Sequence, residues 1–210
     1  MKVLLICGSP HEHGCTYTAL SEMQTVFEAE GVESEIIWLG KDAISGCLGC
    51  GGCKGTARCV IDDIVNRIIE KAEEADGFVF GTPVHYAGAS GAITSCLDRV
   101  FYAGKRGGKN PFYLKPGCVV VSARRAGTTA TFDQLMKYLT ISEMPVVSSR
   151  YWNMVHGNTP EEVMQDKEGL QTMRMLARNM VWLLRCKEAG AKAGVPMPEQ
   201  EVYTPTNFIR

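Results

Sequence analysis

The chain has 210 residues, 45% of them hydrophobic, and a formal net charge of −1 at pH 7. This length suits one domain with a sizeable core, and the near-zero charge argues against nucleic acid or an anionic membrane as a partner. No apolar run approaches the roughly 18 residues of a membrane span, and Lys2 is followed by a core strand rather than a cleavable signal. We therefore expect a cytoplasmic protein whose nine cysteines are ligands or buried thiols rather than disulfides.

Short apolar stretches alternate with helical patterns along the chain. Strands are expected at residues 3–7, 33–39, 76–80, 117–122 and 144–148, and helices at 16–30, 62–74, 91–101, 131–139 and 160–189. This alternation predicts an α/β fold, a doubly wound five-stranded parallel sheet with helices on both faces. We expect residues 1–190 to form the domain and residues 191–210, whose prolines and glycines break helices, to form a C-terminal tail.

The first sixteen residues, MKVLLICGSPHEHGCT, combine a buried strand, a polar turn and a helix start. Unpaired backbone N–H groups and the helix dipole make such a junction a phosphate site. Ser9, His13 and Thr16 can donate hydrogen bonds to phosphate oxygens. The loop has no lysine and lacks the GxxxxGK[ST] pattern, so it suits a terminal phosphomonoester better than a triphosphate with magnesium.

Two other interpretations of this loop are an ordinary βα turn capped by Thr16 and a phosphatase loop. The phosphatase would use Cys7 as a thiolate nucleophile. That chemistry needs an arginine closing the loop, where this chain has His13 and Gly14.

Three loops follow the first, third and fourth expected strands and are rich in glycine, hydroxyl and small residues. They span residues 9–16, 82–88 and 122–128. In open parallel sheets, ligands bind at the carboxyl ends of the strands near the switch point. The three loops together therefore predict one ligand site.

Three motifs carry a resemblance to a known family: GSPHEHGCT, GTPVHYAGASGAITSCLDR and SARRAGTT. They resemble the flavodoxin-like NAD(P)H-dependent FMN reductases over roughly residues 1–150. The resemblance implies a flavodoxin-like fold, FMN as cofactor and NAD(P)H as cosubstrate. The implied FMN contacts are Ser9, Pro10, His13, Gly14, Cys15 and Thr16 around the phosphate, Thr82, Pro83, Val84, His85 and Tyr86 along the ribityl chain and isoalloxazine ring, and Ser122, Arg124 and Gly127 at the ring's other edge.

A cysteine-rich loop lies between the second expected strand and the second expected helix. Its cysteines, Cys47, Cys50, Cys53 and Cys59, are spaced CX2CX2CX5C. Closely spaced thiolates separated by glycines can converge on one centre, as in ferredoxin-type cluster binding. The motif resembles that of the iron–sulfur flavoproteins, a branch of the same family, which implies a [4Fe–4S] cluster. A zinc site and a loop of unmetallated thiols remain alternatives.

The resulting functional hypothesis is an FMN-dependent oxidoreductase. NAD(P)H would supply hydride to the flavin, and electrons would pass to a quinone-like, nitro or azo acceptor, or through the cluster to another protein. No side chain is expected to act as a catalytic acid or base. The alternatives are a non-enzymatic, flavodoxin-like electron carrier and a binding or regulatory protein with an empty site.

The last expected helix predicts an oligomer. Its apolar side carries Leu176, Met180, Leu183 and Leu184, and the Tyr151-Trp152 pair precedes it. A single sheet does not need all of this apolar surface for its own core, so we expect a homodimer or homotetramer with the flavin near the interface.

Overall fold

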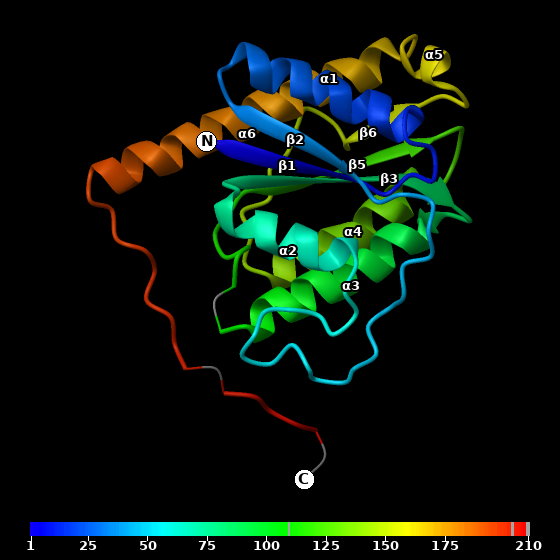
Figure 1. The fold of residues 1–210 in the computed structure, drawn as a ribbon. Helices are drawn as coiled ribbons and strands as arrows, with labels where there is room; N and C mark the ends of the chain where they lie inside the picture. Colours follow the sequence, from blue (N-terminus) through cyan, green and yellow to red (C-terminus); the bar gives the residue numbers. More distant parts are fainter. Residues whose placement is uncertain (109, 203, 209–210) are drawn as a thin grey trace.

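The computed structural model describes residues 1–108, 110–202 and 204–208. Tyr203, Ile209 and Arg210, which belong to the expected tail, lie outside the described residues. The described chain forms a central sheet between two layers of helices, and the segment after the last helix extends away from this body (Figure 1). No helix in the described ranges is long and apolar enough to cross a membrane.

The sheet confirms the predicted five-stranded parallel arrangement. Its parallel strands run in the order β2-β1-β3-β5-β6, and a two-residue strand β4 pairs antiparallel with the end of β3. The strands are β1 Lys2–Cys7, β2 Glu33–Trp38, β3 Gly77–His85, β4 Gly88–Ala89, β5 Gly117–Ala123 and β6 Met154–His156. The helices are α1 Cys15–Ala29, α2 Ile64–Glu74, α3 Gly91–Arg106, α4 Thr128–Ile141, α5 Pro160–Val163 and α6 Lys167–Lys192.

Helices cover both faces of this sheet, as predicted, because side chains alternate between the faces along each strand. On β1, Leu4 and Ile6 pack in a cluster with residues of α2, α3 and α4. The intervening Val3 and Leu5 pack on the other face with α1 and α6. These four side chains are fully buried, and each such burial contributes about 1.5–3 kcal/mol. Strand β1 therefore joins the two halves of the core.

The prediction of a strand at residues 144–148 is wrong, because the fifth parallel strand is β6. Val146 forms only an isolated bridge with Gly117 at the start of β5. Pro145 has no N–H to extend the pairing, and the Ser149 hydroxyl then bonds the carbonyl of Tyr151 at 2.6 Å, which turns the chain outward. The chain rejoins the sheet at Met154, opposite Val121.

The single long helix predicted at residues 160–189 is two helices, α5 and α6. Asp166 has non-helical backbone angles (φ −75°, ψ 77°) and caps α6. One oxygen of its carboxylate accepts from the backbone N–H of Gly169 at 2.9 Å, and the other accepts from that of His156 at 2.7 Å. An aspartate bonded in this way competes with helical hydrogen bonds, so the chain breaks despite its continuous apolar pattern.

The expectation that the apolar side of the last helix faces a partner is wrong for most of the residues on which it rested. Leu176, Met180 and Leu184 are buried in the chain's own core, because α6 packs against α1 on one face of the sheet. Leu183 is partly buried in the same cluster. Tyr151 and Trp152 are the exposed members of that set, with 55% and 52% of their surface accessible.

Candidate cofactor site and cysteine pocket

The three expected ligand loops meet at the carboxyl edge of the sheet, which we call the cofactor edge (residues 8–16, 82–90 and 122–128). The Ser90 hydroxyl donates to the carbonyl of Gly8 at 2.7 Å, which ties the second loop to the first. The hydroxyls of Thr16 and Ser122 lie 2.7 Å apart, which ties the first loop to the third. The described residues thus bring the three loops together at one edge, and their forming one ligand site stays a prediction.

The amino terminus of α1 has the features of an anion site. Gly14 occupies the N-cap position, no described side chain caps this helix, and its first turn contains no acidic residue. Its first backbone N–H groups consequently lack helical partners, and the positive end of the helix dipole is not neutralised within that turn. The preceding residues 10–13 are exposed. A phosphate group fits this position without further basic side chains.

Several polar side chains of the first loop support the loop itself. The Ser9 hydroxyl, almost fully buried, accepts from the backbone N–H of His11 at 3.1 Å, and the Trp38 indole donates to the Ser9 carbonyl at 2.8 Å. The Cys15 thiol donates to the Gly157 carbonyl at 3.6 Å. Burial raises the pKa of the Cys15 thiol, and the nearby carboxylates of α5 add to this effect. The Cys15 thiol is thus turned toward the end of β6.

Cys7 does not meet the needs of a phosphatase nucleophile. It is fully buried in β1, and burial raises the pKa of its thiol. A nucleophilic cysteine needs a lowered pKa and access to its substrate. The phosphatase interpretation is therefore wrong.

The second loop is a strained hairpin between β3 and β4. Tyr86 and Ala87 form its two-residue turn and both have positive φ, at 50° and 60°. Such turns favour asparagine and glycine, because other side chains meet the backbone in this conformation. Tyr86 is fully exposed, whereas Thr82 is buried and accepts from the backbone N–H of Ser90 at 3.1 Å. Non-glycine residues in this conformation concentrate at ligand sites.

The third loop packs directly on that hairpin. Gly127 has a φ of 95°, and a Cβ placed on it would lie 2.7 Å from the Cα of Ala87 and 2.8 Å from Val84. A glycine is needed here for both its backbone angle and the close approach of the two loops. Arg124, three residues earlier, is exposed at the same edge.

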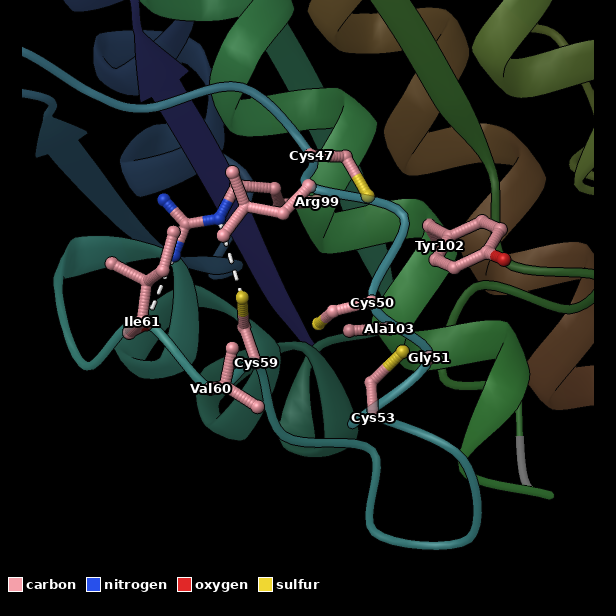
Figure 2. Close-up of a pocket in the computed structure, with 11 residues that line it drawn as sticks. Cys47, Cys50, Gly51, Cys53, Cys59, Val60, Ile61, Arg99, Tyr102 and Ala103 are labelled. Carbon is pink, nitrogen blue, oxygen red and sulfur yellow. Dashed lines mark hydrogen bonds between the residues drawn. The ribbon is translucent and has the colours of Figure 1, made fainter.

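The four cysteines of the second motif line a single pocket, which we call the cysteine pocket (Figure 2). Its empty volume, counted together with the solvent at its mouth, is about 340 Å³, and residues of α3 bound it on one side. Cys47 and Cys50 are exposed, Cys53 is buried, Cys59 is partly buried, and all four thiols are free. Among the described residues, no group of three or more His, Cys, Asp or Glu side chains is arranged to hold a metal ion.

Comparison with known proteins decides the family. The model of the NADPH-dependent FMN reductase family matches residues 1–159. The chain belongs to this family. An iron-sulfur flavoprotein of Methanocaldococcus jannaschii is 32% identical over 88% of this chain and 98% of its own length. Another, from Methanosarcina thermophila, is 24% identical over 86% of this chain and 93% of its own length.

The likeness to solved structures concerns the fold. A flavodoxin from the domain Archaea superposes with a TM-score of 0.59 and 12% sequence identity, covering 88% of this chain and 99% of that one. The sheet of this FMN reductase family member is therefore flavodoxin-like, as the resemblance implied.

Several residues that stabilise the cofactor edge were not predicted from the sequence of this FMN reductase family member. Trp38, Ser90 and Gly157 anchor the first loop through the bonds described above. Ser90 carries a sequence signal, because serine before a glycine-initiated helix is typical of an N-cap, and its hydroxyl does accept from the N–H of Ile93. Trp38 and Gly157 carry none, since their partners lie far away in the sequence.

Arg99 of α3 is a second residue that sequence reasoning missed. Its side chain is 1% exposed and lies against the cysteine pocket. The guanidinium forms a bidentate pair with Asp63, at 2.6 and 2.9 Å. Asp63 also accepts from the N–H of Val65 as the N-cap of α2. One ion pair thus links α3 to the start of α2, next to the cysteines.

Proposed function

We propose that this protein is an FMN-dependent oxidoreductase that takes hydride from NAD(P)H. The observation that carries the proposal is the uncapped amino terminus of α1 at the point where three glycine- and hydroxyl-rich loops meet. Membership of the FMN reductase family supports it. When bound, FMN would accept the hydride and release electrons to a quinone-like, nitro or azo acceptor.

The proposed role of the chain's own residues is to bind and orient the flavin. The backbone N–H groups of residues 12, 13, 15 and 16 would face the phosphate, with His13 as a side-chain donor, whereas the N–H of Gly14 donates to the His11 carbonyl at 3.3 Å. The exposed Tyr86 and the neighbouring residues 82–85 would lie along the ring and ribityl chain, and Arg124 and Gly127 would border the ring. Ser122 would support the phosphate end through Thr16, because their hydroxyls are in direct contact. No side chain needs to move a proton.

Replacing Thr16 with alanine is expected to weaken FMN binding about tenfold to a hundredfold, as measured by flavin fluorescence titration. The change removes the Thr16 hydroxyl, which contacts Ser122 at the phosphate end, and with it a charge-assisted hydrogen bond to the phosphate that would contribute about 1.5–3 kcal/mol to binding. Thr25→Ala is the matched control, because Thr25 lies on the same helix and its exposed hydroxyl donates to the carbonyl of Ser21 in that helix. If the two variants bind FMN with equal affinity, Thr16 has no role in the FMN site.

We further propose that Cys47, Cys50, Cys53 and Cys59 hold a [4Fe–4S] cluster. Their spacing, the pocket that they share and the names of the relatives support this proposal. The donor set fits, since four thiolates are the usual ligands of such a cluster. Four thiolates can also hold a zinc ion, which stays the alternative to the cluster. The cluster would supply one-electron transfer, which would let a protein act as the acceptor.

Rapid mixing of the flavin-loaded protein with NADH and with NADPH tests the oxidoreductase proposal. Anaerobic loss of the oxidised flavin absorption is expected within seconds or faster with at least one of the two nucleotides. A carrier without enzymatic activity would keep an oxidised flavin with both nucleotides and yet exchange electrons with a reduced redox protein. Absence of any flavin in protein purified with added FMN would instead favour the empty-site alternative.

An oligomer is still expected, on narrower grounds than the sequence suggested. Tyr151, Trp152 and Trp182 are each more than half exposed. Asn179 donates to the Ser148 carbonyl at 2.8 Å, which brings the helix face of Asn179 and Trp182 beside the segment containing the other two aromatics. Light scattering at micromolar concentration should give a mass of at least twice 23.0 kDa. A monomer under these conditions would contradict the prediction.

A further inference from the structure

One of the four cysteines is held differently from the others. The Arg99 Nε lies 3.3 Å from the Cys59 sulfur and donates to it (Figure 2). The remaining guanidinium donors are also used: they bond Asp63 and the carbonyls of Ser45 (3.3 Å) and Ile61 (2.9 Å). Arg99 thus gathers both ends of the cysteine loop around one buried cation.

The backbone of Cys59 is fixed from a second direction. The side-chain amide of Asn66 accepts from the Cys59 N–H at 2.8 Å and donates to the Cys59 carbonyl at 3.0 Å. Asn66 lies on α2 and is buried. Cys59 is therefore positioned by two helices, whereas Cys47 and Cys50 lie exposed in the loop.

We infer that Arg99 is a positioning residue for the cluster: its N–H bond to Cys59 orients this ligand and, balanced by Asp63, sets the reduction potential. The inference rests on the proposed function, because it assumes that the cysteine pocket holds the cluster. Hydrogen bonds to ligand sulfurs and nearby charge are among the factors that set such potentials. Reduction adds negative charge, so a donor and a cation beside the sulfur favour the reduced state.

The pair makes opposite predictions for its two members. In Arg99→Gln the cation is lost and the Cys59 sulfur loses its charged donor, so the cluster potential is expected to become more negative. In Asp63→Asn the guanidinium loses its counter-ion while asparagine still serves as an N-cap, so the potential is expected to become more positive. A purely structural role for the pair would not move the potential in opposite directions.

Redox titration of anaerobically reconstituted protein tests this inference, with the flavin potential of the same sample as an internal control. Arg99→Gln should also bind its iron about 10- to 100-fold more weakly in competition with a chelator, the usual effect of losing a partner of a metal ligand. Arg174→Gln is the matched control, because Arg174 pairs with Glu22 between α6 and α1 on the other face of the sheet. That variant should leave the cluster potential unchanged.

The outcomes separate this inference from the proposal beneath it. Native protein that takes up no iron defeats the cluster itself. A second outcome is that the native protein binds iron but the two variants do not shift the cluster potential in opposite directions. If Arg99→Gln and Asp63→Asn both keep the native potential, or both shift it in the same direction, the proposed role of Arg99 is wrong. If Arg99→Gln fails to fold or to load, Arg99→Lys replaces it. Lysine keeps the charge but not the five donors of arginine. The Arg99→Lys variant should therefore load iron and have a cluster potential below that of the native protein. If its cluster potential equals the native one, the inference is wrong.

Discussion

Gly127→Ala is expected to weaken FMN binding at least tenfold and to lower the free energy of unfolding by about 2 kcal/mol or more. The left-handed backbone angle alone costs an alanine about 1–2 kcal/mol. The added Cβ would also lie 2.7 Å from the Cα of Ala87, and backbone atoms cannot rotate away as a side chain can. The third loop must therefore move away from the hairpin, and the site expected to hold the ring opens. Flavin titration and urea unfolding measure the two effects.

Gly31→Ala is the matched control for this prediction. Gly31 also has a positive φ, at 71°, but its Cβ would meet nothing within 4 Å, and it lies between α1 and β2, at the opposite end of the strands from the cofactor edge. This variant should lose about 1 kcal/mol of stability and bind FMN as the native protein does. If the two alanine variants bind FMN equally well, the contact between the two loops has no role in binding.

The sheet could be predicted because its strands satisfy strong local rules. Residues 3–7 are continuously apolar and end at Gly8, the signature of a strand covered on both faces. Strand β6 could not be predicted, since it has three residues and its pairing with β5 depends on a loop closed by Ser149. The break before α6 was equally hidden, because it depends on the bond between Asp166 and the backbone of His156.

The candidate site shows the same division between local and distant causes. Three glycine- and hydroxyl-rich loops could be assigned to one edge, because parallel topology brings successive strand ends together. The contact between Thr16 and Ser122 joins residues 106 positions apart, and no local pattern encodes it. In the sequence, Arg99 has the pattern of an ordinary charged residue in a helix. Only the packing of α3 against the cysteine loop reveals that it faces a sulfur and a carboxylate.

Cys50→Ala is expected to abolish cluster iron while FMN stays bound. Native protein purified without oxygen should contain about four irons per chain, together with broad visible absorption beyond the flavin bands. Protein purified in air should lose much of this iron, because Cys47 and Cys50 are exposed. Cys50 is part of an exposed loop and is absent from the buried core, so its replacement should leave the fold unchanged. Iron analysis and the flavin spectrum of the same sample measure both expectations.

Cys186→Ala is the control, because Cys186 is an exposed free thiol on α6, away from the cysteine pocket. It should keep its full iron content. The fold is the reason to expect that the two proposed cofactors bind independently: the proposed phosphate site lies at β1 and α1, whereas the cysteines lie in the separate loop between β2 and α2. If Cys50→Ala loses flavin together with iron, the two sites are coupled and the expected independence is wrong. If the native protein holds no iron after anaerobic reconstitution, the cluster proposal is wrong, and only the proposal of an FMN-dependent oxidoreductase without a cluster stands.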